Sequence, residues 1–539
     1  MSPMNTLSDK SYAKFFGEGF REMVEELMPD VVQEHPLDAY PVLRNFLHHV
    51  SSPMIHPTHM PGHTRKLYED LESAAAPKEA PKGPKAPKPK PDKAVAAANK
   101  QAASDKKQKE YSDYVKTPEG KTAHSSALAA HKAEIARIKG LGKGAGKNER
   151  QKAHKAFSST PAGQHENTKK LAARQAEISR MQNEGAAALA KRGGNPFEHM
   201  RRGFHAAFNV DPNTGQQGPD EDENTKQQKL KASKDAFTNF LIKRGKVSPA
   251  TAAQSNMFGE NHKTQTSAGV GYKTIGLSLA PSHHSGYKHD MCPKASTECR
   301  ENCLGLKAGG NRQFPFATLR SKILRTHFIH EHPEEAARLL HHEIGENEKA
   351  AHAIGYKSGI RLNVVSDIPY EHLMPKKFFQ SHEDSPEKPG SMFYDYTKMH
   401  GRMNHKDMPK NYALALSHTG GNHAESNDKQ AVSHLNKGGV VAMVYQRGKG
   451  VPHPTHVEDV QSGKRWKIAN GDSDDNVFDR HRSVGVPDSE GVVSGLKLKG
   501  VSNGSAGHFA NNVDPDGIIR INKPQGGTLP GQDQFNILK

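Results

Sequence analysis

Cysteine is scarce in this chain, and its scarcity narrows the possible structures. The 539 residues contain three cysteines, too few for a disulfide framework. All three lie in one short run, Cys292-Pro-Lys-Ala-Ser-Thr-Glu-Cys299-Arg-Glu-Asn-Cys303. Avoidance of cysteine elsewhere is typical of a reducing compartment, which argues against one isolated structural disulfide. We therefore interpret the run as a loop whose thiolates share a metal ion or a cluster.

Long apolar segments are also missing. The sequence has no apolar run that could cross a bilayer, and its first residues lack the basic patch and apolar core of a signal peptide. Hydrophobic residues make up only 34% of the chain, which is too little to pack a core over its whole length. We expect a soluble, unprocessed, intracellular protein with poorly packed segments.

Positive charge is in excess and unevenly placed. The net charge is +17, from 76 Lys and Arg against 59 Asp and Glu, and most of the excess lies between Lys78 and Lys246. Residues 74–93 alternate proline, alanine and lysine, which is typical of an extended spacer. We predict that residues 73–250 form a mostly disordered Lys/Ala/Pro-rich linker with transient helices. Such a basic arm either binds nucleic acid through its phosphates or acts as a solubilising linker.

The hydrophobic pattern divides the rest of the chain. Residues 1–72 carry apolar side chains at helical spacing, which predicts a small helical module for docking or assembly. Residues 260–505 alternate strand-like and helical runs, and residues 506–539 are expected to be a C-terminal tail. The expected strands are residues 275–280, 361–365, 392–396, 412–416, 440–445 and 492–498. This order predicts an α/β fold, either a partial parallel barrel or an open parallel sheet of about six strands.

Polar side chains recur where the expected strands end. Ligands of parallel α/β folds bind at the carboxyl ends of the strands, and the cysteine run follows the first expected strand. Carboxylates and a lysine follow later strands, where they could contact a cofactor or transfer protons. These candidate catalytic residues are Asp367, Glu371, Asp395, Lys398 and Asp472. We expect them to face the candidate metal and cofactor ligands Cys292, Cys299 and Cys303 at one edge of the sheet.

The thiol spacing leaves two kinds of metal centre open. Zinc takes four ligands, so the three cysteines need a fourth, for which His283, His284 and His289 lie upstream. A four-iron, four-sulfur (4Fe–4S) cluster bound by three cysteines keeps one iron open for a small molecule. A three-cysteine loop after the first strand of a partial barrel resembles the radical S-adenosylmethionine enzymes, although their usual C-x3-C-x2-C spacing is absent here. That resemblance implies a 4Fe–4S cluster that binds S-adenosylmethionine.

Several motifs between residues 273 and 500 occur in a fixed order. They are Lys273-Thr-Ile-Gly, Leu277-Ser-Leu-Ala-Pro281, the cysteine run, Arg361-Leu-Asn-Val-Val-Ser-Asp367-Ile-Pro-Tyr-Glu371, Phe393-Tyr-Asp395-Tyr-Thr-Lys398, Gly471-Asp472 and Gly495-Leu-Lys497-Leu-Lys. On these motifs the segment resembles the phage-associated gene product eighty-eight domain family. The resemblance implies a phage-derived protein in the host cytoplasm or the virion, and it assigns no activity.

Two functions of different classes fit these residues. The first is an iron–sulfur, radical S-adenosylmethionine-like enzyme acting on a small molecule and tethered by the basic arm. The second is a non-enzymatic, zinc-stabilised phage interaction or DNA-binding protein, in which the metal supplies folding free energy. In either case the basic arm is expected to contact nucleic acid or phage structural proteins, and no membrane.

Overall fold

The computed structural model describes residues 93–140, 145–307, 315–385, 388–420, 425–448, 450–498 and 510–522. Contacts divide the chain into two compact units, Met1–Lys107 and Gln108–Lys539. The described part of the first unit is the beginning of helix α6 (Lys93–Tyr114). The helical module predicted at residues 1–72 lies outside the described residues.

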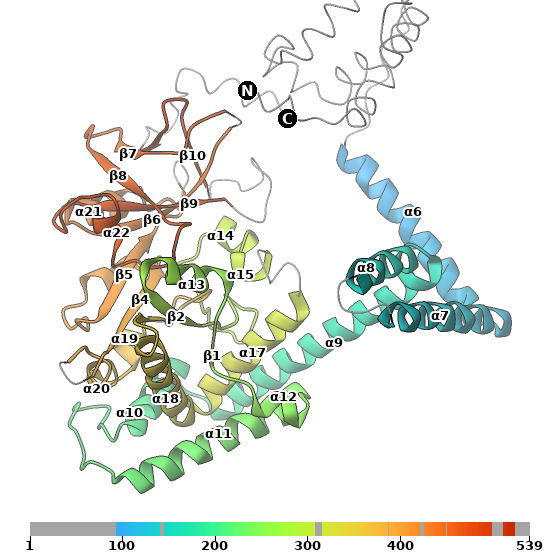
Figure 1. Cartoon of the computed structure of the whole chain (residues 1–539), viewed down its shortest axis with the longest axis horizontal. Coiled ribbons are helices and arrows are strands. Elements are labelled where there is room, and N and C mark those ends of the chain that lie inside the picture. Colours follow the sequence, from blue (N-terminus) through green and yellow to red (C-terminus); the bar gives the residue numbers. More distant parts are fainter. Residues whose placement is uncertain are drawn as a thin grey trace, which may run out of the picture. The chain divides into compact units, whose positions relative to one another are not determined.

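Helices form the amino-terminal part of the second unit (Figure 1). They are α7 (Pro118–Lys139), α8 (Ala145–Ser158), α9 (Pro161–Arg192), α10 (Pro196–Ala207), α11 (Glu223–Gly245) and α12 (Pro249–Ala253). Capping explains several of their starts, because side chains accept first-turn N–H groups just before the helix. These caps are Thr117, Thr160, Asn195, Asp222 and Ser248. No helix among the described residues is both long and apolar enough to cross a bilayer.

Helices occupy most of residues 93–140 and 145–250, where the sequence predicts a mostly disordered linker, and residues 73–92 lie outside the described residues. Helices α10 and α11 contribute Phe204 and Phe237 to the main hydrophobic core. Helix α9 packs closely against α17 (Pro315–Glu331), because a Cβ at Gly185 would lie only 2.3 Å from the ring of His327. The apolar stripe of each helix is too thin for the helix to fold independently. It is wide enough to stabilise the helix once a neighbouring element packs against it.

The centre of this unit is an eleven-stranded mixed sheet. Its strands are β1 (Phe258–Gly259), β2 (Tyr272–Leu277), β3 (Lys357–Arg361), β4 (Ser391–Thr397), β5 (Tyr412–Ser417), β6 (Val440–Gln446), β7 (His456–Asp459), β8 (Arg465–Asn470), β9 (Val492–Lys497), β10 (Asn511–Asn512) and β11 (Ile518–Ile521). The neighbours β2-β3-β4-β5-β6-β9-β8 are parallel throughout. Antiparallel β1 and β7 flank this run, and since its two end strands do not pair, the sheet is not a closed barrel.

Helices connect successive parallel strands, as the alternating pattern predicts. The connecting helices are α17 and α18 (Pro333–His352), α19 (Tyr370–Leu373), α20 (Lys376–Gln380), α21 (Asp428–Asn436) and α22 (Arg480–Ser483). Shorter turns are α13 (His262–Thr266), η4 (Ser267–Val270), α14 (Thr297–Glu301), α15 (Leu304–Lys307) and η5 (His400–Asn404). Helix α18 begins at Pro333, and Glu334 and Glu335 occupy its first turn, where the helix dipole favours negative charge.

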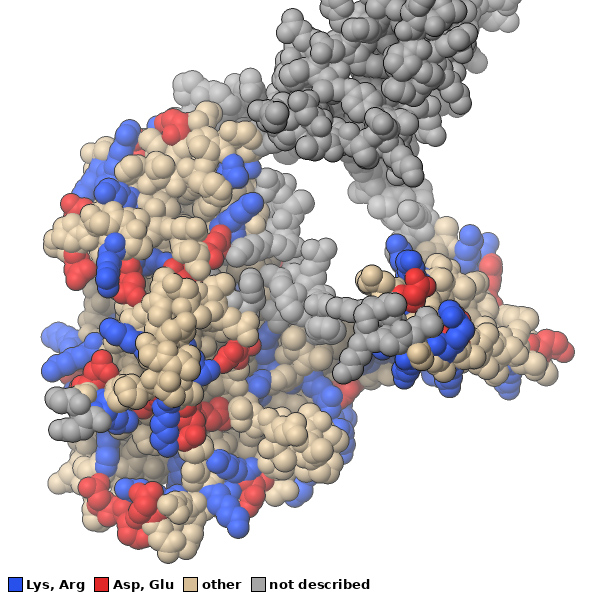
Figure 2. All heavy atoms as spheres, in the orientation of Figure 1, with Lys and Arg blue, Asp and Glu red and all other residues tan. Residues whose placement is uncertain are grey.

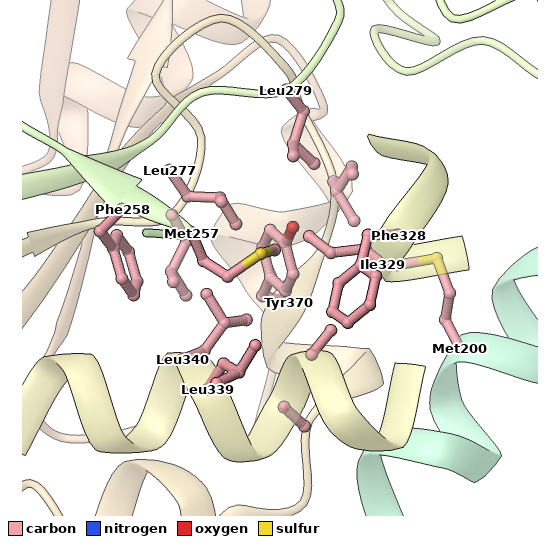
Figure 3. Packing of buried hydrophobic residues seen from close by; sticks show 14 of the residues in the cluster. Met200, Met257, Phe258, Leu277, Leu279, Phe328, Ile329, Leu339, Leu340 and Tyr370 are labelled. Atoms are coloured by element: carbon pink, nitrogen blue, oxygen red, sulfur yellow. The ribbon is translucent and has the colours of Figure 1, made fainter. Parts of the chain in front are cut away.

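Alternate side chains of the central strands enter different cores, because successive residues of a strand point to opposite faces. Phe393 of β4 lies in the main core with α17 and α18, whereas the next residue, Tyr394, lies in a smaller core. Figure 3 shows the main core, in which Leu339 and Leu340 of α18 lie below Leu277 of β2. This packing fixes the sheet against the helices and leaves the carboxyl ends of its strands to the connecting loops.

Each of the six predicted strands has a counterpart in the sheet, and two of them are shifted. The strand predicted at 275–280 is β2, which ends at Leu277. The strand predicted at 361–365 overlaps β3 only at Arg361, and residues 362–365 form the turn after it, since the buried Leu362 continues the apolar pattern beyond the strand end. The sequence pattern did not indicate β1, β7, β8, β10 or β11. Strand β8 is the last strand of the parallel run, and the other four are two to four residues long.

Residues 510–522 contain β10 and β11 where the sequence predicts a tail. The side-chain nitrogen of Asn511 lies 3.1 Å from Nδ1 of His418, which follows β5. The backbone N–H of Asn522 donates to the carboxylate of Asp428 over 2.9 Å, and Asp428 also binds Nε2 of His418. This late segment therefore holds the connection between β5 and α21.

Several histidines are buried as neutral rings. In α17, Nδ1 of His330 donates to the carbonyl of Thr326 (2.9 Å), which leaves its Nε2 to accept from Nε2 of His289, also 2.9 Å away. Burial lowers the pKa of His330 to about 3 and the pKa of His327 to about 4. The pKa of His341 also falls to about 3 through burial. Each ring binds a proton far less readily in the folded chain.

We expect the free energy of unfolding to decrease as the pH falls from about 6.5 towards 4. The unfolded chain takes up protons on these rings near the ordinary pKa of 6.5, whereas the folded chain takes them up only at lower pH, so acid favours unfolding. Denaturant titrations over this pH range measure the slope. His330→Gln should make the slope shallower by up to ~1.4 kcal/mol per pH unit, the contribution of one proton.

The matched control for that substitution is His352→Gln, because His352 is exposed on α18. The control should retain the slope of the unchanged protein. If His330→Gln and the unchanged protein have equal slopes, buried neutral His330 does not contribute to acid sensitivity.

Candidate functional site

The loop that carries the cysteines, residues 278–307, follows β2 and lies in space beside the end of β3. The backbone N–H of Asp367 donates to the carbonyl of Met291 over 2.8 Å. Next to this bond, Sγ of Cys292 lies 3.5 Å from the carbonyl oxygen of Val365. The cysteine loop is therefore attached to the β3–α19 connection, which is the edge of the sheet that the sequence predicts.

All three thiols are free and partly buried. Burial raises the pKa of Cys292 to about 12, and it also raises the pKa of Cys303. Cysteine thiolates suit zinc or an iron–sulfur cluster chemically. Within the described ranges, however, no three His, Cys, Asp or Glu side chains lie close enough together to hold a metal ion. The described thiols therefore do not surround a single metal ion.

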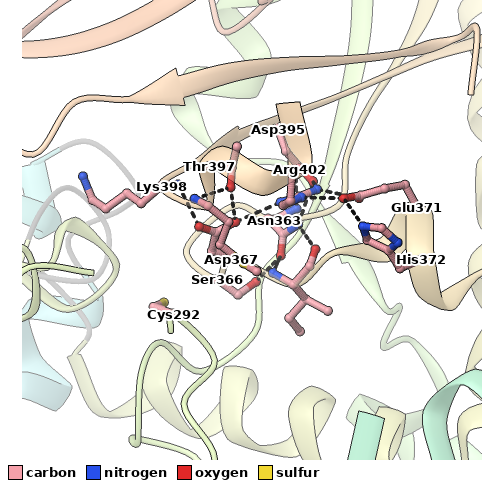
Figure 4. Close-up of polar contacts among 12 residues, drawn as sticks. Cys292, Asn363, Ser366, Asp367, Glu371, His372, Asp395, Thr397, Lys398 and Arg402 are labelled. Atoms are coloured by element: carbon pink, nitrogen blue, oxygen red, sulfur yellow. Dashed lines mark hydrogen bonds and ion pairs between the residues drawn. The ribbon is translucent and has the colours of Figure 1, made fainter. Parts of the chain in front are cut away.

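A buried arginine connects the loops at the strand ends (Figure 4). Arg402 lies in η5, and its side chain is only 1% exposed. Its Nε and Nη2 each donate to the carboxylate of Glu371 over 2.8 Å, and its Nη1 donates to Asp367 over 2.8 Å. The third carboxylate, that of Asp395, lies 3.5 Å from Nη2. One guanidinium thus joins residues from the loops after β3 and β4 and from β4 itself.

The remaining oxygens of these carboxylates also have donors. Asp367 accepts from the hydroxyl of Thr397 (2.7 Å) and from the backbone N–H of Lys398 (2.8 Å). Asp395 accepts from the backbone and the side-chain amide of Asn363, over 2.7 and 2.6 Å, and from the hydroxyl of Tyr412. Burial raises the pKa of Asp395, and its nearby donors oppose that effect. The three carboxylates hold the strand ends together.

A cavity of about 740 Å³ lies beside this network, and we call it the carboxyl-end cavity. Its lining comes from the cysteine loop, from the connections after β3, β4 and β5, and from α21. The lining residues are Lys294, Pro369, His372, Lys398, Met399, His400, Gly401, Arg402, Thr419, Glu425, Ser426, Asn427 and Gln430. Figure 4 shows the side chain of Lys398 pointing away from Arg402, on the side where Cys292 lies. The ammonium of Lys398 donates to the carbonyl of His418 over 3.2 Å.

Glu425 connects the cysteine loop to the opposite wall of the carboxyl-end cavity. Its carboxylate accepts the backbone N–H of Thr297 over 2.9 Å, at the start of α14. The hydroxyl of Thr419, after β5, donates to the carbonyl of Glu425 over 2.9 Å. The walls that surround this cavity are therefore bonded to each other.

The predicted catalytic residues are not all brought to this cavity. Asp367, Glu371 and Asp395 meet at Arg402, and Lys398 lines the cavity. Asp472 instead follows β8, four strand positions from β4, and accepts the backbone N–H of Lys497 over 2.9 Å.

The histidines upstream of the cysteines have other contacts. His289 pairs with His330, and His283 lies 3.8 Å from the carboxylate of Asp290. The carbonyl of His284 accepts from the side chain of Gln182 in α9. These contacts do not assemble a fourth zinc ligand among the described residues.

Sequence reasoning missed Arg402, Lys294 and Glu425. One signal for Arg402 was present, since three acidic residues predicted to share a buried edge require a cation between them. Lys294 and Glu425 gave no comparable signal, because they lie in loops whose partners are set by the fold.

A second cavity, of about 530 Å³, lies between α11, α18 and β1–β2, away from the strand ends.

Replacing Arg402 should destabilise the fold strongly. Arg402→Gln leaves buried carboxylates without their counter-charge, so we expect the free energy of unfolding to fall by about 3–5 kcal/mol. The matched control is Arg202→Gln, because Arg202 is 67% exposed in its pair with Glu198. That change should cost at most about 1 kcal/mol. Denaturant unfolding of the three proteins provides the comparison, and similar losses for the two variants would show that the Arg402 pair is not structurally important.

Cys292 should react slowly with iodoacetamide in the folded, chelator-treated protein. A pKa of about 12 instead of 9 leaves about a thousandfold less thiolate at neutral pH, and the thiolate is the reactive form. Site-resolved mass spectrometry measures the rate, with the same peptide in urea-unfolded protein as the control. Equal rates in folded and unfolded protein would contradict the burial of this thiol.

Comparison with known proteins gives one match. Residues 251–512, from α12 to β10, match the model of the family described as gene product 88. No curated protein and no solved structure matches the chain. The part of the chain that carries the parallel strands, the three thiols and Arg402 is thus similar to the gene product 88 family of phage, which confirms the resemblance seen in its motifs.

Proposed function

We propose that the gene product 88-like domain is an enzyme that binds an anionic small molecule in the carboxyl-end cavity. The observation that carries this proposal is the position of the cavity, which lies where the parallel strands β3, β4 and β5 end. Parallel α/β sheets bind ligands at this edge because the loops there can vary while the strands stay fixed. Its volume of about 740 Å³ falls in the range of small-molecule sites.

The charges of the lining favour an anion. Lys294 and Lys398 bring two ammonium groups to the cavity, and His372 and His400 add imidazoles. The charge of Arg402 is already matched by its carboxylates, and Glu425 is tied to the N–H of Thr297. Positive charge therefore exceeds negative charge at the wall, which suits a carboxylate or a phosphate group.

The finer proposal is a 4Fe–4S cluster on the cysteine loop, with S-adenosylmethionine extending from it into the carboxyl-end cavity, which the loop lines through Lys294. It is supported by the three free thiols in one loop and by lysines suited to the carboxylate of that cofactor. A cluster spaces its thiolates more widely than a single metal ion does, since each thiolate binds a different iron. Iron with acid-labile sulfide in anaerobically purified protein would support this form, whereas its absence would exclude it.

A zinc-stabilised interaction protein is the second candidate. It is favoured by the carboxylates around Arg402, because their oxygens are committed to holding the strand ends and not to a substrate. Stoichiometric zinc without iron, together with unfolding after Cys→Ser changes, would support this candidate. The anion-binding test below separates it from the enzyme.

Anions should stabilise the protein against heat. Inorganic phosphate is the anion probe, and a ligand that binds only the folded state raises the melting temperature in a saturable way. S-adenosylmethionine, a net cation that carries one carboxylate, is tested separately as the probe of the finer proposal. Lys294→Ala and Lys398→Ala should each weaken the apparent affinity about tenfold, a loss of about 1.4 kcal/mol. Differential scanning fluorimetry over a concentration series measures both effects.

The control is Lys357→Ala, because Lys357 is exposed at the opposite, amino end of β3. This variant should bind as tightly as the unchanged protein. If all three lysine changes weaken the apparent affinity equally, anion binding depends on overall charge and not on the cavity. If no saturable rise of the melting temperature is seen, the cavity is not an anion site.

A further inference from the structure

The first part of the second unit carries positive charge that the carboxyl-end cavity does not use. Helices α7, α8 and the amino-terminal half of α9 contact one another and form a small bundle, which we call the α7–α9 bundle. Figure 2 shows blue Lys and Arg side chains on the visible face of this bundle, at the right of the view. Acidic residues Asp113, Glu134 and Glu149 near or within it each pair with a cation three residues further along.

Three lysines of α7 have no such pair. Lys121, Lys132 and Lys139 are exposed, and no ion pair involves them among the described residues. Their separations of 11 and 7 residues are close to three and two full turns, so the three side chains lie within about 20° of one another around the helix. They form a row about 27 Å long, and we call it the α7 lysine row.

The face that carries the row has no acidic residue. The other positions on this face are Ser125, Leu128, Ile135 and Ala136. The nearest acidic residue of the helix, Glu134, points elsewhere on the helix and pairs with Arg137 over 2.7 Å. The row is thus a line of uncompensated positive charge on a fixed helix.

We propose that the α7 lysine row is a binding surface for the phosphate backbone of nucleic acid. Duplex DNA carries a negative charge about every 1.7 Å, so a row of this length faces roughly 16 phosphate charges. Lysines that neutralise phosphates release counterions, which drives binding that is independent of sequence. No aromatic side chain lies on this face, so base stacking does not contribute.

An anionic membrane fits the surface less well. Helices that lie on membranes place large apolar side chains opposite their cations, exposed to the lipid. In α7 no such exposed apolar face lies opposite the row: Leu128 and Ile135 are half-buried beside the lysines, and Ile138 is buried. Little apolar surface is left to contact lipid, so the lysines remain the contact groups of this face.

The test compares two charge-matched triple variants of the full chain. The first replaces the row, as Lys121→Gln, Lys132→Gln and Lys139→Gln. The second replaces Lys226, Lys376 and Lys377, whose side chains are at least 42% exposed and already paired with Glu223, Asp407 and Asp220. Fluorescence anisotropy with a labelled random-sequence duplex measures affinity between about 50 and 200 mM salt. The chain has other lysines, so the difference between the variants is the readout.

Loss of the row should reduce the slope of log K against log salt by about 2.7, which is three phosphate contacts at about 0.9 each. The control variant should change the slope by less than about one, and circular dichroism should show equal helix content in both. Equal slopes for the two variants, or no binding at the lowest salt, would overturn the proposal. Row-dependent binding to phosphatidylserine vesicles without DNA binding would overturn it in favour of a membrane.

Discussion

The buried ion pair of Arg402 is the interaction on which the carboxyl edge of the sheet depends. Taking a guanidinium and three carboxylates out of water is costly, and the cost is offset only while every partner keeps its place. Glu371 and Asp367 follow β3, whereas Asp395 belongs to β4. A shift of one strand end would leave a buried charge unpaired. The edge therefore moves as a unit, and the carboxyl-end cavity has a rigid floor.

The sequence predicted the parts of the fold that depend on local pattern. Alternating apolar runs revealed the parallel strands, and the rule that ligands lie at carboxyl ends placed Asp367, Glu371 and Asp395 together. The sequence did not single out Arg402, because it is one of 76 Lys and Arg residues and because its partners come from other connections. The helices before residue 250 were underestimated for a related reason. Their apolar stripes are thin, and the surfaces that cover them cannot be recognised within the segment itself.

Positive charge takes two different forms in this molecule. In the carboxyl-end cavity a few ammonium groups line a concave wall next to a buried polar network, where an anion would be partly shielded from solvent. On α7 the lysines stand in an exposed row, where salt screens each of them. We expect the first arrangement to discriminate between ligands by shape and the second by charge density. The net charge of +17 does not reveal either arrangement, because it does not record where the charges lie.

The bonds from Asn511 and Asn522 to the β5–α21 connection determine when this connection can take its final place as the chain is synthesised. Thr419, Glu425 and Asn427 line the cavity within that connection, yet His418 and Asp428 at its ends are held by residues about a hundred positions later. A ribosome delivers the chain from its amino end, so this wall stays unsupported until Asn511 and Asn522 have been made. The nascent chain can complete its helices and early strands first, and the wall of the cavity becomes fixed only after these later residues have joined it.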